Sequence, residues 1–144
     1  MRKLVRLHQM PTRLAAGAYI INSGLSKRDA DEKQATGYHG MATNTYPFLG
    51  KMDPVAFTRL LSRTELALGA ALVTPFVPSL VAGAALAGFA GGLLGLYLRT
   101  PGMRREGDIR PTEQGIGLAK DVWLMGIGLG MVTEGISDLR NRRK

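Results

Sequence analysis

The longest uncharged stretch of the chain constrains its fold more than any other feature. From Leu66 to Leu98 there is no Asp, Glu, Lys or Arg. As one unbroken helix this stretch would be about 50 Å long, whereas a bilayer core is about 30 Å thick. Within it, Pro75 and Pro78 cannot both sit inside a regular helix, and Ser79 is a suitable N-cap for a second helix. The stretch therefore predicts a tight hairpin of two membrane helices, over 57–75 and 79–98.

Two flanking segments complete a predicted set of four transmembrane helices. Residues 12–27 are mostly apolar and begin after Pro11. The basic segment Met1–Arg6 ahead of them is also typical of a signal peptide, but no A-x-A-like site follows the apolar run before Lys27, which favours an uncleaved signal anchor. Residues 114–134 are apolar apart from Lys120 and Asp121, and Thr112 can cap this helix.

The connections between these helices are predicted from their composition. Residues 28–56 read as a long polar loop, near the end of which Asp53 and Pro54 restart a helix as N-cap and first residue. Residues 99–111 form a short basic loop, and the polar tail 138–144 is expected to fray. We therefore predict a single domain over 1–144, an all-α four-helix membrane bundle with both termini on the same side.

The formal charge of +8 raises the question of a nucleic-acid partner. The Lys and Arg residues mostly flank the apolar segments, which favours a membrane lipid surface over nucleic acid. Their numbers on the two faces nearly balance. Because the terminal segments are short and almost free of acidic residues, we expect the termini to be cytoplasmic.

Glycines in the third and fourth predicted helices suggest how the helices pack. Small residues let backbones approach closely in lipid, where little hydrophobic force drives helices together. The alternative is that glycine is simply common in membrane helices. The spacing i, i+4 predicts a close-packed helix pair built on Gly88, Gly91, Gly92 and Gly95 in one helix and on Gly126 and Gly130 in the other.

Nearly all ionisable residues within the predicted helices lie toward one face of the membrane, opposite the termini; Arg13 is the exception. Charges at such depth normally face the bundle interior and are paired. The sequence therefore predicts an apolar half near the termini and a polar half at the other face. The candidates for this polar cluster are Asn22, Lys27, Arg63, Glu65, Tyr97, Lys120 and Asp121.

The predicted cluster has two interpretations. In one, Glu65 and Asp121 pair with Lys27, Arg63 or Lys120 and only lock the helices in register. In the other, a quinone enters from lipid, its carbonyl groups accept hydrogen bonds from Lys27, Lys120 or Tyr97, and Glu65 or Asp121 relays protons. A small transporter is disfavoured, because no polar path is predicted to cross the apolar half.

At these residues the chain resembles the DoxX family of small bacterial membrane proteins. The resemblance rests on Arg13-Leu14, Ser23-Gly24-Leu25-x-Lys27, Glu65-Leu66-x-Leu68-Gly69-Ala70 and Lys120-Asp121-Val122-x-Leu124-Met125-Gly126. It implies a four-helix bundle in the bacterial inner (plasma) membrane, and an accessory role beside thiosulfate:quinone oxidoreductases or other redox and respiratory partners. The long segment 28–56, which contains His39 between two glycines, departs from the family pattern.

Residues that would indicate catalysis by this chain alone are missing. The sequence contains no cysteine, and its two histidines, His8 and His39, fall on opposite predicted faces, so no catalytic or metal-binding residue is assigned. We therefore expect an accessory, quinone-associated subunit of a larger membrane redox or respiratory complex. The alternative is a purely structural subunit that docks larger partners.

Overall fold

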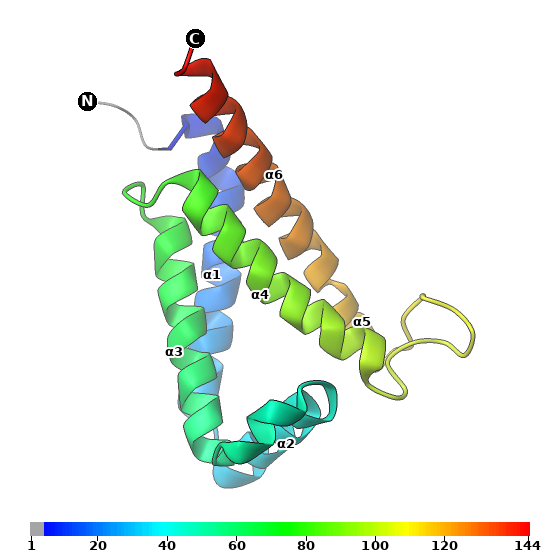
Figure 1. Ribbon diagram of the computed structural model, residues 1–144. Coiled ribbons are helices and arrows are strands. Elements are labelled where there is room, and N and C mark those ends of the chain that lie inside the picture. The colour runs from blue at the N-terminus through cyan, green and yellow to red at the C-terminus, as the bar shows by residue number, and fades with distance from the viewer. Residues whose placement is uncertain (1–4) are drawn as a thin grey trace.

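The computed structural model describes residues 5–144, and every regular element within them is a helix (Figure 1). The α-helices are α1 (Met10–Arg28), α2 (Glu32–Thr45), α3 (Pro54–Val73), α4 (Ser79–Arg99), α5 (Ile116–Ala119) and α6 (Asp121–Asn141). Short 3-10 turns cover Leu7–Gln9 and Pro47–Lys51. The only β-type pairing in this part of the chain is an isolated bridge between Arg104 and Pro111.

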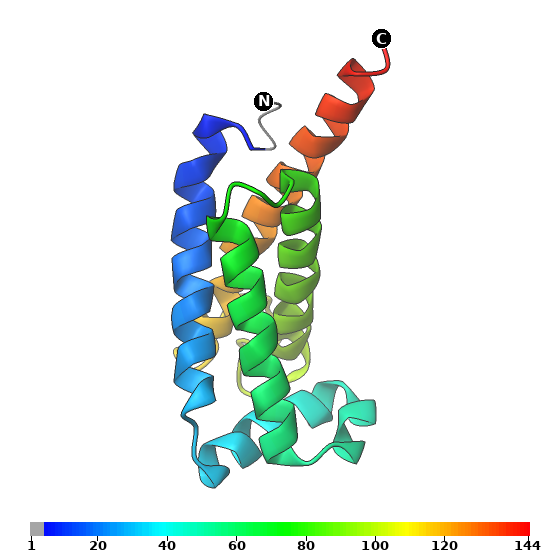
Figure 2. The ribbon, with the colours of Figure 1, turned by 90° about the vertical axis from the view of Figure 1, so that its left-hand side faces the viewer.

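The four long helices form two pairs. Helix α1 packs along α3 and α4 packs along α6, whereas contacts between the two pairs are fewer (Figures 1 and 2). The start of α1, the α3–α4 turn and the carboxyl end of α6 lie at one end of the molecule, here named the terminal end. Helix α2 crosses the opposite end, named the α2 end.

The local signals at the central hairpin act largely as expected. Asp53 accepts hydrogen bonds from the backbone N–H groups of Val55 and Ala56, and Pro54 is the first residue of α3. The segment with two prolines separates α3 from α4. Ser79, however, is not an N-cap, because α4 already begins at this residue and its hydroxyl group bonds elsewhere.

Residues 28–56 are not an open loop, as the sequence suggested, because α2 fills much of this segment. Asp31 caps the helix by accepting from the N–H of Gln34, whose side chain reaches back to the Asp31 N–H. This reciprocal arrangement satisfies two backbone donors at the start of a helix. Ala35 and Ala42, seven residues apart, are buried on one side of α2. Such a weak apolar stripe is easily read as a polar loop.

The fourth predicted helix is divided and longer than expected. Helix α5 is followed by a bend at Lys120, and α6 then continues to Asn141. The prediction that residues 138–144 fray was wrong for residues 138–141, because Asp138 pairs with Arg6 and the helix runs past it.

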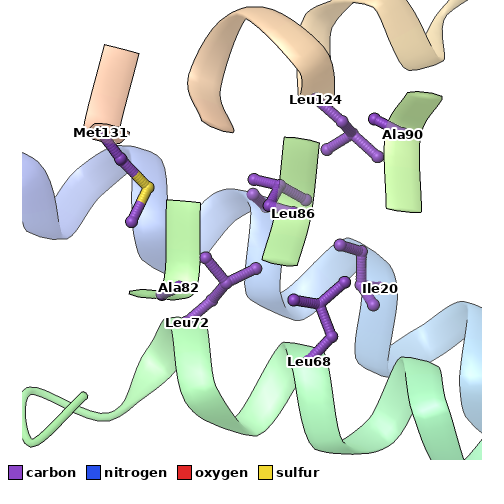
Figure 3. Close-up of a cluster of buried hydrophobic side chains, with 9 residues drawn as sticks. Ile20, Leu68, Leu72, Ala82, Leu86, Ala90, Leu124 and Met131 are labelled. Carbon is purple, nitrogen blue, oxygen red and sulfur yellow. The ribbon is translucent and has the colours of Figure 1, made fainter. Parts of the chain in front are cut away.

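An apolar core lies between the two ends and draws residues from all four long helices (Figure 3). Leu72 and Leu86 are fully buried, and Ile20 and Ala82 lie beside them. The full cluster is Ala16, Ile20, Leu68, Leu72, Ala82, Leu86, Ala90, Leu124 and Met131. Burial of these side chains joins the α1–α3 pair to the α4–α6 pair.

Close helix contacts are made by glycines other than those the spacing predicted. A Cβ on Gly128 would lie 2.7 Å from the backbone nitrogen of Ala87, and one on Gly83 would lie 2.8 Å from the carbonyl oxygen of Gly128. In the other pair, a Cβ on Gly17 would lie 3.1 Å from the carbonyl oxygen of Gly69. Both helix pairs therefore touch backbone to backbone.

The predicted packing glycines mostly have other surroundings. Added Cβ atoms on Gly88, Gly126 and Gly130 would meet nothing within 4 Å. On Gly91 a Cβ would meet only the Met125 side chain, and on Gly92 and Gly95 it would approach the hydroxyl group of Tyr46. The predicted glycine-packed pair, α4 with α6, exists, but the assignment of its contact residues was wrong because these glycines lie on other faces of the two helices.

Among residues 5–144, two helical segments, α4 and Ile116–Asn141, are long and apolar enough to cross a membrane. Only 28% of the apolar window of α4 and 22% of that of Ile116–Asn141 are buried within the chain. The core helix of a water-soluble protein would be mostly buried. Most residues of these two apolar windows are instead at least partly exposed at the surface of the chain.

Candidate functional site

A buried ion pair joins α1 and α3 at the α2 end. Lys27 Nζ lies 3.1 Å from Glu65 Oε1 and also donates to Ser23 Oγ at 2.6 Å. The side chain of Glu65 is 3% exposed and that of Lys27 is 15% exposed. Nearby, Ser62 donates to the carbonyl oxygen of Gly24 at 2.7 Å. The close approach of α1 to α3 at Gly24 brings these polar groups within bonding distance.

Asp121, the first residue of α6, adds a second carboxylate to this region. It is 5% exposed, and Lys27 and Glu65 both act electrostatically on it. Within residues 5–144 no side chain is within ion-pair distance of its carboxylate, and none forms a hydrogen bond with it. We name Ser23, Lys27, Glu65 and Asp121 the inner cluster. It combines one cation with two carboxylates, and only one of those carboxylates is directly paired.

The other candidates for the polar cluster lie elsewhere. Asn22, Arg63 and Lys120 are exposed on the outer surface of their helices. Tyr97 is buried, but its hydroxyl group donates to the carbonyl oxygen of Ile109 at 2.5 Å and so holds the loop between α4 and α5. Asp121 and Lys120 are neighbours in sequence, yet only Asp121 turns inward.

Helix α2 lies beside the inner cluster at the α2 end. The Tyr38 ring is 5.6 Å from Lys27 Nζ, a distance at which the ring face attracts a cation. His39 bonds the carbonyl oxygen of Leu49 and meets the Phe57 ring edge-on. Tyr46 donates to the carbonyl oxygen of Gly92 at 2.7 Å, where α4 has no side chain to exclude the ring. Helix α2 is thus attached to α1, α3 and α4.

No family model, curated protein or solved structure matches this chain. The site must therefore be interpreted from its own chemistry. In residues 5–144 no three His, Cys, Asp or Glu side chains gather as metal ligands would. The inner cluster offers instead an ammonium donor and two carboxylates next to apolar helix surface.

A second polar centre occupies the terminal end, where the sequence predicted an apolar half. Arg13, which the sequence set apart from the cluster, is fully buried. Its guanidinium group closes the carboxyl end of α3 and the turn after it. It donates to Ser79 Oγ and to the carbonyl oxygens of Ala71, Leu72, Thr74 and Val77. Arg13 therefore satisfies carbonyl groups that have no partner within the helix.

From Arg13 a chain of hydrogen bonds leads across the terminal end to α6. Ser79 Oγ donates to Gln9 Oε1 at 2.5 Å, and Gln9 Nε2 donates to Glu134 Oε2 at 2.5 Å. Glu134 also contacts His8 at 2.8 Å and Arg6 at 3.7 Å, and Arg6 pairs with Asp138. The terminal network, as we name it, comprises Arg6, His8, Gln9, Arg13, Ser79, Glu134 and Asp138.

One sequence signal could have revealed this network. Glu134 and Asp138 are four residues apart, so they share a face of a helix. A four-helix topology also places the last turns of the fourth helix beside the start of the first, where Arg6 and Gln9 occur. Because the fourth helix was predicted to end at residue 134, the pairing of Asp138 with Arg6 was not anticipated.

Proposed function

We propose that the chain is an integral membrane protein in which α1, α3, α4 and α6 each cross the bilayer. The distribution of side chains carries this proposal, because many large apolar residues face outward while several ionisable groups within the helices are buried. Tyr19, Leu129 and Trp123 are more than half exposed, whereas Arg13 and Glu65 are buried. In lipid, apolar surface is best placed outside and ionisable groups inside.

Helices α1 and α3 are less apolar than α4 and α6, but much of their polarity is internal. Arg13 and Glu65 lower the hydropathy of these helices, yet neither would meet lipid. The exposed residues Arg59 and Arg63 lie in the first half of α3, toward the α2 end. Long basic side chains at such a position extend to the membrane surface. These charges are therefore compatible with four spans in which the membrane boundary lies toward the start of α3.

Site-directed labelling tests the number of spans, because the chain has no native cysteine. Three single-cysteine variants are made: Gly37→Cys on α2, Glu106→Cys in the loop after α4, and Arg143→Cys after the end of α6. With four spans, a membrane-impermeant maleimide should label positions 37 and 106 from the same side and position 143 from the other. If only α4 and α6 crossed, positions 37 and 143 would share a side, which would refute the four-span arrangement.

We further propose that this protein is an accessory subunit of a membrane redox complex and that it binds a quinone-type headgroup at the inner cluster. Asp121 carries this proposal. A buried carboxylate is costly without a partner, and this one has no hydrogen bond from residues 5–144. A quinone carbonyl oxygen accepts hydrogen bonds, which the Lys27 ammonium group could donate, and the two carboxyl groups could exchange protons with the headgroup.

The resemblance to the DoxX family supports the same proposal. Of its pattern residues, Arg13, Gly24, Glu65, Gly69 and Asp121 are buried, whereas Leu14, Leu25, Ala70, Lys120, Val122 and Gly126 are exposed. The buried ones include the ionisable residues that the proposal uses. The family's setting makes a redox or respiratory complex the expected partner and the bacterial inner membrane the expected location, with cytoplasmic termini.

A purely structural role is the alternative, and the Lys27–Glu65 pair favours it. This pair and the bond from Ser62 to Gly24 already hold α1 against α3 without any ligand. In that case the inner cluster would serve only assembly, and a larger partner would dock on the exposed apolar surface.

Binding of a short-chain quinone analogue to the detergent-purified protein separates the two roles. Asp121→Asn should abolish binding while the unfolding temperature stays within a few degrees, because Asp121 takes part in no ion pair with residues 5–144. Glu113→Gln, an exposed carboxylate on the approach to α5, is the control and should bind normally. If the unaltered protein binds no analogue, or if Asp121→Asn binds as well as the unaltered protein, the quinone proposal fails and the structural role remains.

A further inference from the structure

A large cavity lies away from the inner cluster, at the terminal end. It is a cleft of about 610 Å³ between the first turn of α4 and the last turns of α6. Its lining mixes cationic and apolar groups. Arg6 and Arg142 line it, as do Leu80, Val81 and Leu139. We name it the terminal cleft.

We propose that the terminal cleft binds the headgroup of an anionic phospholipid. The inference rests on the proposed membrane-spanning arrangement, but it is independent of any ligand at the inner cluster. In that arrangement the cleft opens where the helices leave the bilayer. Basic pockets between helices at this level suit anionic headgroups, and the apolar lining suits the adjoining acyl chains.

The charges around the cleft favour a phosphate diester. Asp138 also lines it, but this carboxylate is paired with Arg6. Arg142 is exposed, and within residues 5–144 its guanidinium group forms no hydrogen bond or ion pair. The remaining cationic charge in the lining is therefore that of Arg142, with Arg143 and Lys144 next in the chain.

The wall formed by α4 adds hydrogen-bond donors. The backbone N–H groups in the first turn of a helix have no partner within the helix, and no side chain of the described residues caps α4. Ser79 would be the natural cap, but its hydroxyl group donates to Gln9 and accepts from Arg13. Ser79, Leu80 and Val81 of this first turn line the same cleft as Arg142.

The apolar part of the lining distinguishes a lipid from a free anion. Val81 is 57% exposed and Leu139 is 48% exposed, and both border the cleft. In a bilayer these side chains would contact the acyl chains of a lipid whose headgroup sits against Arg142. A free phosphate ion would make no use of this surface. The geometry therefore points to a phospholipid.

Lipid binding to the delipidated full-length protein in detergent tests the proposal, with native mass spectrometry as the readout. Phosphatidylglycerol should bind about five-fold more tightly than phosphatidylcholine, the difference expected for one additional basic contact. Arg142→Gln should remove this preference. Arg143→Gln makes the same charge change one residue later, outside the cleft lining, and should keep it. Neither change should disturb folding, because both residues are exposed.

Three results would overturn the proposal. Equal affinity for the two lipids would show that the cleft does not select an anionic headgroup. If Arg142→Gln and Arg143→Gln reduced the preference for phosphatidylglycerol equally, the basic tail would attract anionic lipids in general and not through the cleft. Displacement of phosphatidylglycerol by millimolar inorganic phosphate would show a site for free anions. Cysteine labelling at positions 37, 106 and 143 reports separately on the membrane arrangement, so its failure is distinguishable from failure of the cleft.

Discussion

Arg13 Nε donates to the carbonyl oxygen of Leu72 at 2.8 Å, which links the second turn of α1 to the last turn of α3. With its four further hydrogen bonds this side chain organises the turn that joins the two helix pairs. A buried arginine in this position has a structural reason to be there, since each carbonyl group it reaches would otherwise lack a partner.

Replacement of Arg13 should therefore destabilise the protein strongly. Arg13→Met leaves Ser79 and several carbonyl oxygens without their donor, and we expect a loss of about 3 kcal/mol or more in the free energy of unfolding. Unfolding in mild detergent by titration with sodium dodecyl sulfate measures this. Arg63→Met is the matched control on an exposed site, and its effect should stay within about 0.5 kcal/mol. Similar losses in both variants would contradict the assigned role.

The two glycines Gly128 and Gly130 should respond oppositely to the same substitution. Gly128→Ala places a methyl group against the backbone of α4, so the α4–α6 pair must separate and stability should fall by about 1–3 kcal/mol. Gly130→Ala meets open space and should be neutral or slightly stabilising, because alanine favours helix. Thermal unfolding in detergent compares them. If Gly130→Ala lowered stability as much as Gly128→Ala, this would contradict the orientation of α6 in which Gly128 faces α4 and Gly130 faces open space.

The Lys27–Glu65 pair should show strong coupling in a double-mutant cycle. Lys27→Met alone leaves Glu65 buried and unpaired, at a cost of about 3–5 kcal/mol. Adding Glu65→Leu removes the stranded charge and should restore most of that stability. Unfolding free energies of the two single variants and the double variant give the coupling. Additive effects of the two substitutions would show that the pair is not formed in the folded protein.

Tyr46 and Gly95 offer a compensating pair that tests the attachment of α2. A Cβ on Gly95 would collide with the Tyr46 hydroxyl group, so Gly95→Ala should loosen α2 from α4. Tyr46→Phe removes the colliding atom together with its bond to Gly92, and the double variant should hold α2 better than Gly95→Ala alone. Hydrogen exchange of residues 32–45 reports the attachment. Equal exchange in all variants would show that this contact does not hold α2.

Several parts of this structure could be anticipated from local chemistry. The prolines at 75 and 78 end one helix and precede the next, because the ring removes a donor and fixes the backbone wherever it occurs. Asp53 with Pro54 starts α3 for an equally local reason. The pairing of Lys27 with Glu65 was one of several possibilities, and the helix topology made it plausible.

The errors at the two polar centres concern relationships between helices. Ser79 looked like a cap until Arg13 and Gln9 engaged its hydroxyl group. Arg63 and Lys120 looked equivalent to Glu65 and Asp121, yet the first two face outward. The terminal network joins residues more than a hundred positions apart in sequence, such as Gln9 and Glu134, and no local pattern records such a contact.

The sequence by itself determined where α3 begins and where the chain breaks between α3 and α4, because prolines and caps act on the residues next to them. Only the tertiary structure decided which face of each helix turns inward. Two residues along a helix are separated by about 200° of rotation, so Gly128 meets a neighbouring backbone while Gly130 meets none. That rotation depends on packing among all four helices at once. It placed Glu65 and Asp121 in the inner cluster and Arg13 at the centre of the terminal end.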